Sequence, residues 1–114
     1  MAMVETDSLL DRKCVPCEGG EAPLTPTEVK EYQQQLITEW EVEDNRRIKR
    51  EFEFNSFADA MVFVNDVAAI AEREGHHPDM YIYFKKVVIE LTTHAINGLS
   101  ENDFILARKI EVCC

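Results

Sequence analysis

The sequence has no long hydrophobic run and little positive charge, and these two deficits exclude several classes of protein. No segment reaches the roughly 18 consecutive apolar residues of a membrane-spanning helix, and the first residues lack the charged and apolar regions of a signal peptide. The 114 residues include 12 Lys and Arg against 22 Asp and Glu, which gives a net charge of −10. Because nucleic-acid binding needs clustered cations, we expect a cytoplasmic protein that binds neither membranes nor nucleic acids.

Cysteine is scarce as well. The four cysteines are Cys14, Cys17, Cys113 and Cys114. A C-x2-C pair can form half of a zinc site, but no second pair of Cys or His residues has the spacing of metal ligands. Neighbouring proline and glycine residues place the first pair in a loop, whereas a redox C-x-x-C normally opens a helix. We therefore expect surface thiols and no bound metal.

The length fits one domain. Residues 1–23 contain prolines and glycines without sustained periodicity, so we expect an extended N-terminal lead-in. Residues 24–114 are expected to form the single folded domain. Within it, Thr25, Pro26 and Glu28 form a helix start with a capping box, and the helix is predicted to run to about residue 37.

Apolar periodicity predicts the remaining elements. Strands are expected over 40–42, 48–54, 80–84 and 86–93, a long helix from Ser56 to about Glu74, and a last helix that starts at Ser100. The expected buried stripe of the long helix consists of Phe57, Ala60, Met61, Val64, Val67, Ala68 and Ala71. The order predicts an α+β fold: a four-stranded antiparallel sheet with three helices packed on one face.

The three histidines of the chain gather around two predicted loops. His76 and His77 are adjacent, follow Gly75 at the end of the long helix, and precede Pro78. His94 follows the last predicted strand. Binding groups concentrate in loops on rigid scaffolds, and imidazole titrates near neutral pH, so this set suits acid–base catalysis. Two alternatives remain: a three-histidine zinc site, which adjacent ligands make sterically awkward, and a structural role for His77.

The segment from Glu72 to Pro78, E-R-E-G-H-H-P, resembles the E-x3-H-H-P signature of the pterin-4a-carbinolamine dehydratases. The family pattern continues with an aromatic residue, met by Tyr83 or Phe84, then a histidine met by His94 and an aspartate met by Asp103. The resemblance covers roughly residues 20 to 112. Met80 departs from the animal-type members, which carry a tryptophan beside the pterin.

The resemblance implies a function and a set of residue roles. The expected reaction is dehydration of a 4a-hydroxytetrahydropterin to a quinonoid dihydropterin and water, without a metal or organic cofactor. His76 and His94 would be the acid–base residues, and His77 would orient the substrate. The residues expected to bind substrate are Glu72, Pro78, Thr92, Thr93 and Asp103.

Simpler readings of these polar residues stay open. Glu72 can be a solvated helix end, and Asp103 can be the capping partner of Ser100. Thr92 and Thr93 can be present for their strand propensity.

The resemblance also implies partners for the protein and suggests two alternative functions. It implies a homodimer or homotetramer, and an aromatic amino acid hydroxylase in the same pathway as the source of the substrate. One alternative is a non-catalytic protein-interaction module, because animal members of the family also bind a transcription factor. Another is a pterin-binding protein of molybdopterin metabolism. Loss of the histidines would be tolerated by an interaction module but not by a pterin protein.

Overall fold

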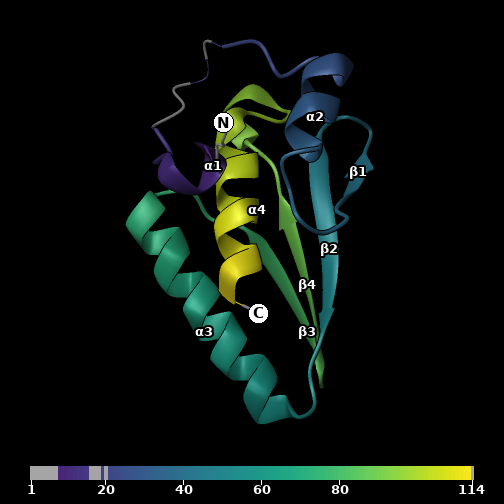
Figure 1. The fold of residues 1–114 in the computed structure, drawn as a ribbon, viewed down its shortest axis with the longest axis vertical. Coiled ribbons are helices and arrows are strands. Elements are labelled where there is room, and N and C mark those ends of the chain that lie inside the picture. The colour runs from purple at the N-terminus through teal and green to yellow at the C-terminus, as the bar shows by residue number, and fades with distance from the viewer. Residues whose placement is uncertain (1–7, 16–18, 20, 114) are drawn as a thin grey trace, which may run out of the picture.

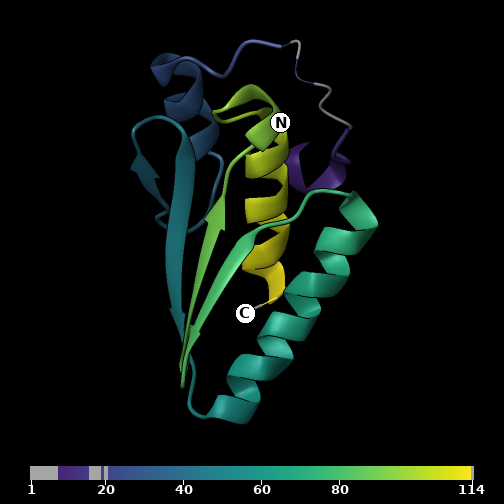
Figure 2. The same ribbon diagram turned by 180° about the vertical axis from the view of Figure 1, so that it is seen from behind.

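The computed structural model describes residues 8–15, 19 and 21–113. The helices are α1 (Ser8–Asp11), α2 (Pro26–Gln33), α3 (Phe57–Glu74) and α4 (Glu101–Cys113), with a 3-10 turn, η1, at His94–Ile96. The strands are β1 (Glu41–Glu43), β2 (Arg47–Glu53), β3 (Asp79–Tyr83) and β4 (Lys86–Leu91). They form one antiparallel sheet in the order β1-β2-β4-β3. The predicted α+β fold is confirmed, and the main helices lie beside one face of this sheet (Figures 1 and 2).

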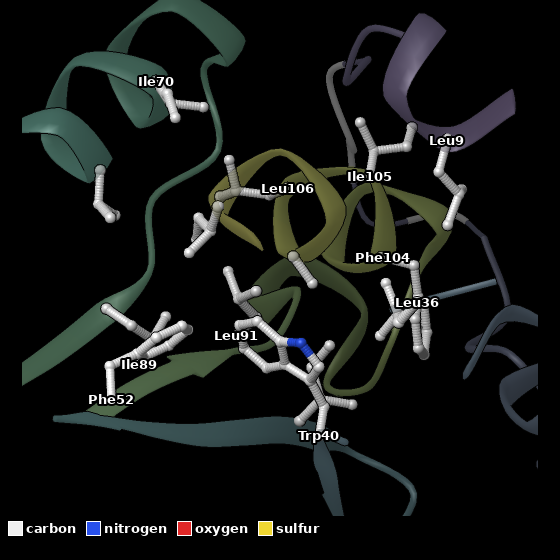
Figure 3. Close-up of a cluster of buried hydrophobic side chains, with 14 of the residues drawn as sticks. Leu9, Leu36, Trp40, Phe52, Ile70, Ile89, Leu91, Phe104, Ile105 and Leu106 are labelled. Carbon is white, nitrogen blue, oxygen red and sulfur yellow. The ribbon is translucent and has the colours of Figure 1, made fainter. Parts of the chain in front are cut away.

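Alternation along the strands decides which face the helices cover. Val87, Ile89 and Leu91 of β4 are fully buried, and Ile48 of β2 is buried beside them. Figure 3 shows Ile70 of α3, Leu106 of α4 and residues of the sheet pointing into one shared core. Apolar burial of this kind is the main favourable term in folding. The sheet and the two long helices therefore form the rigid frame from which the connecting segments extend.

The ends of the elements follow the expected local chemistry. The Thr25 hydroxyl accepts from the Glu28 amide at 3.2 Å, and the Glu28 carboxylate accepts from the Thr25 amide at 2.9 Å, so the predicted capping box is present. Gly75 has a φ of 70° and ends α3 in the left-handed conformation that favours glycine. This turn directs the chain away from the helix immediately before His76.

Several predicted details were wrong. The first helix of the domain ends at Gln33 and not near residue 37. Phe84 lies outside β3, in the two-residue turn to β4 with a φ of 54°, because the chain must reverse there. Phe57, expected on the buried stripe of α3, is exposed at the first turn of the helix, whereas Phe63 and Ile70 are buried.

The lead-in also differs from the expectation of an extended segment. It contains α1, whose Leu9 is fully buried against the core. Lys13 donates to the carbonyl of Arg73 at 3.0 Å, and the Cys14 amide donates to the Glu74 carboxylate at 2.8 Å. These contacts tie the segment to the end of α3. Among the residues that the structure describes, no helix has both the length and the apolar character needed to cross a membrane.

Candidate active site

His76 contacts a buried carboxylate on α4. In Figure 2 the segment that joins α3 to β3 crosses α4, and His76 Nε2 lies 2.6 Å from Asp103 Oδ1. The His76 side chain is 13% exposed and that of Asp103 is 0% exposed. The imidazole therefore lies at the boundary between a buried anion and solvent, which is a suitable position for a group that exchanges protons with a bound molecule.

The second oxygen of Asp103 is held by two further donors. Asp103 Oδ2 accepts from the Thr93 hydroxyl at 2.8 Å and from the Ser100 backbone amide at 2.9 Å. The hydroxyls of Thr93 and Ser100 are themselves 2.7 Å apart. Asp103 thus accepts from the Ser100 amide, as its interpretation as a capping partner predicts, and it also contacts His76, which the sequence did not predict.

His94 lies near this cluster because the preceding residue, Thr93, contacts Asp103. Backbone hydrogen bonds between Thr93 and Gly98 close a tight loop after β4, and η1 occupies the loop. Thr93 is buried at the Asp103 carboxylate, and His94, the next residue, is exposed. The chain thus brings the backbone at His94 next to the group that binds His76. Within the described ranges, the His94 side chain makes no hydrogen bond.

His77 has a separate and more exposed partner. Its Nε2 lies 2.7 Å from Glu72 Oε2, with side-chain exposures of 60% for His77 and 79% for Glu72. The two residues are five apart and meet across the end of α3. An ion pair at this exposure contributes little to stability, so this contact orients the His77 ring without burying it.

The other residues proposed from the sequence lie around this cluster but have different contacts. Pro78 is half-buried between His77 and the start of β3. The Thr92 hydroxyl donates to the Arg46 carbonyl at 2.6 Å, so it links β4 to the β1–β2 turn. Asp103 and Thr93 were expected to bind substrate directly. Both side chains are buried and bonded to protein groups.

Sequence reasoning missed Glu74, which is buried beside the histidine loop. Its carboxylate accepts from Lys109 Nζ at 2.7 Å and from the Cys14 amide at 2.8 Å. Burial opposes ionisation of Glu74, but the hydrogen bonds from Lys109 and Cys14 outweigh it and lower its pKa. The carboxylate therefore anchors the last turn of α3 to α4. A buried acid at a helix end has no periodic signal that would distinguish it from a solvated one.

The prediction of surface thiols was wrong for Cys14. Its side chain is buried, and burial together with the nearby Glu74 charge raises its pKa to about 12, so the thiol stays protonated at neutral pH. Cys17 and Cys114 lie outside the described residues. In the part of the chain that the structure describes, no group of three or more His, Cys, Asp or Glu side chains is placed to hold a metal ion.

Two hollows lie near the lead-in. The larger has a volume of about 520 Å³, lies between α1, α3 and α4, and has no histidine in its lining. A smaller one of about 220 Å³ is lined by Ile96 and Ser100, on either side of the loop that follows His94. Neither lining contains a histidine, but Ser100 of the smaller hollow contacts Thr93, the residue before His94.

Comparisons with known sequences identify the same family along most of the chain. The family model described as pterin 4 alpha carbinolamine dehydratase matches residues 22–113. A protein from Alkaliphilus metalliredigens is 45% identical over 105 residues, which cover 92% of this chain and 95% of that protein. Another from Nitrosomonas eutropha is 47% identical over 110 residues, covering 96% of each chain. Both names assign these relatives to the pterin-4-alpha-carbinolamine dehydratases.

Solved structures show the same fold. A structure described as a transcriptional coactivator/pterin dehydratase from Brucella melitensis is 35% identical, with a TM-score of 0.74, and the match covers 80% of this chain and 97% of that one. A pterin dehydratase-like protein described as a RuBisCO assembly factor in the alpha-carboxysome is 23% identical, with a TM-score of 0.60. The match with this second protein covers 68% of this chain and 90% of that one, and at this identity it supports only a shared fold.

Proposed function

This chain belongs to the pterin-4a-carbinolamine dehydratase family, and on that basis we propose that it dehydrates 4a-hydroxytetrahydropterins to quinonoid dihydropterins. The single observation that carries the proposal is the pairing of His76 with buried Asp103, next to the segment that carries His94. The protein would be a hydro-lyase that acts in the cytoplasm. An aromatic amino acid hydroxylase would supply its substrate.

The proposed reaction needs one proton delivered and one removed. The lone pair on N5 of the pterin assists cleavage of the C4a–O bond, and the departing hydroxyl takes a proton and leaves as water. A proton is lost from the ring system as the quinonoid product forms, so the overall proton count is unchanged. Imidazoles are suited to both transfers because they titrate near neutral pH. We assign the two transfers to His76 and His94, which need no metal or organic cofactor.

The remaining residues support these two in our proposal. His77, oriented by Glu72, is exposed and available to position the pterin. Pro78 shapes the loop that carries both adjacent histidines, and Thr92 holds the end of β4. Asp103 and Thr93 are positioning residues, because their buried polar atoms are already bonded to protein groups.

The test is a steady-state assay in which a hydroxylase or a chemical route generates the 4a-hydroxytetrahydropterin and absorbance follows its loss. We expect the rate of loss to rise in proportion to the concentration of added protein. A folded protein without any effect would contradict the proposal and favour an interaction module. Pterin binding, seen by fluorescence, without acceleration would favour a pterin carrier.

We also propose that the protein is a homodimer or homotetramer. β3 is an edge strand, and Tyr81, Ile82 and Tyr83 on it are exposed, as is Phe84 in the turn that follows. An exposed apolar edge of this kind pairs readily with another chain.

Sedimentation at micromolar concentration should therefore show an oligomer, and Tyr83→Lys should shift it toward monomer. Ile37→Lys, at an exposed apolar residue of the α2–β1 connection, is the matched control and should sediment like the wild type. A monomeric wild type would contradict the proposal.

A further inference from the structure

The hydrogen atoms of the polar cluster can be assigned from its geometry. Asp103 Oδ2 accepts from both the Thr93 hydroxyl and the Ser100 amide. A threonine hydroxyl has one hydrogen, and that of Thr93 points to Asp103. The 2.7 Å contact between the Thr93 and Ser100 hydroxyls must then be a donation from Ser100 to Thr93. The donors therefore run in one direction, from Ser100 through Thr93 to Asp103.

The same reasoning fixes the proton on His76. Asp103 Oδ1 lies 2.6 Å from His76 Nε2, and a carboxylate can only accept. A proton shared between the two groups resides on nitrogen, since a carboxylic acid is a stronger acid than an imidazolium. His76 Nε2 therefore carries a hydrogen in both the neutral and the charged imidazole. Among the described residues, His76 Nδ1 has no hydrogen-bond partner, so this nitrogen is available for the exchange of protons.

The positions of these groups are rigidly held. The Thr93 backbone is bonded in both directions to Gly98, with N···O distances of 2.9 and 3.4 Å. Threonine is β-branched and stiff about χ1, so the backbone fixes where its hydroxyl points. Thr93 and Asp103 are 3% and 0% exposed, so water does not compete for their contacts. A hydrogen-bonded partner on one ring nitrogen is the usual means by which proteins select a histidine tautomer.

We propose that the Ser100–Thr93–Asp103 chain holds neutral His76 as its Nε2–H tautomer, so that His76 exchanges protons with substrate through Nδ1. Thr93 and Ser100 are thus positioning residues that act through Asp103. The tautomer assignment stands on the geometry alone. Only the identity of the molecule that meets Nδ1 rests on the proposed dehydratase function.

The experiment combines nitrogen NMR of ¹⁵N-histidine-labelled protein with kinetics. Long-range ¹H–¹⁵N spectra distinguish the two neutral tautomers, and His76→Gln identifies the His76 signals by their absence. Wild-type His76 should show the Nε2–H pattern. Thr93→Val keeps the shape but removes one of the two donors that hold Asp103 Oδ2, so the carboxylate can turn away from His76 Nε2. The variant should therefore mix the tautomers and lower kcat by about tenfold, the value of one buried hydrogen bond, with little change in KM.

Three further variants make the result specific. Thr93→Ser restores a hydroxyl and should recover the tautomer and most of kcat. Ser100→Ala leaves the amide contact to Asp103 in place and should have a smaller effect in the same direction, and it serves if Thr93→Val does not fold. Thr27→Val, at an exposed position in the first turn of α2, should change neither readout.

The outcomes separate this inference from the proposed function. An Nδ1–H pattern in the wild type, or an unchanged tautomer and kcat in folded Thr93→Val, would overturn the inference even in an active dehydratase. The Nε2–H pattern with mixing in Thr93→Val would support it even in a protein without dehydratase activity, in which case only the proposed function fails.

Discussion

Alanine at His76 or His94 is expected to lower kcat/KM for the 4a-hydroxytetrahydropterin by about 10²- to 10⁴-fold, the typical contribution of one positioned acid or base. Each substitution removes one of the two groups that we assign to proton transfer. His77→Ala is expected to raise KM more than it lowers kcat, because the exposed His77 ring is assigned to orientation. Initial rates over a range of pterin concentrations would measure these effects.

A second substitution at His76, to glutamine, separates the effect on catalysis from the effect on the free energy of unfolding. His76→Ala leaves the buried Asp103 carboxylate without its partner, which costs about 1–3 kcal/mol of stability. His76→Gln places an amide N–H donor near the position of Nε2 but has no titratable group. We expect His76→Gln to unfold at nearly the wild-type denaturant concentration and to be as inactive as His76→Ala. A glutamine variant with wild-type activity would remove His76 from the proposed mechanism.

Glu111→Ala is expected to lower the free energy of unfolding by about 3–5 kcal/mol, the typical cost of breaking a buried charged cluster. The Glu111 carboxylate accepts from the amides of Ile37 and Thr38 at 3.0 and 2.9 Å, from the Thr38 hydroxyl, and from the Trp40 indole at 3.0 Å. Arg108 lies 3.6 Å away. Without the carboxylate, these donors remain in place but lose their shared acceptor.

Urea unfolding followed by tryptophan fluorescence would measure this loss, since the only tryptophan is itself a donor to Glu111. Val112→Ala, at the next position of α4, is the control. Val112 is exposed, so the change should stay within about 0.5 kcal/mol. A loss of less than about 1 kcal/mol in Glu111→Ala would show that the cluster does not anchor the α2–β1 connection to α4 as described.

Local signals explain why most of the fold could be predicted from the sequence. The capping box at Thr25 and the glycine at the end of α3 depend on residues within a few positions of each other. The alternation of Val87, Ile89 and Leu91 directly reflects burial of one sheet face. The burial of Leu9 could not be predicted in this way, because it depends on packing between the lead-in and a distant core and has no periodic pattern.

The sequence predicted which residues belong to the candidate site but not which of them contact one another. The rarity of histidine and its place in two loops identified His76 and His94 as candidates. The role of Asp103 depends on three contacts, with His76, Thr93 and Ser100, and the farthest of these partners is 27 positions away. A contact between residues so far apart has no local sequence pattern. The sequence could therefore suggest that Asp103 is a helix cap or a ligand-binding group, but not that it is a buried carboxylate bonded to His76.

The most direct test of the proposed dehydratase activity is a single-turnover measurement. Freshly generated 4a-hydroxytetrahydropterin would be mixed with excess protein in a stopped-flow instrument, and its absorbance decay recorded at several protein concentrations. We predict first-order decay whose rate rises with protein concentration and then saturates, as expected for binding followed by catalysed loss of water. Decay at the buffer rate at every concentration, with protein shown to be folded, would contradict the assignment of this chain as a pterin dehydratase.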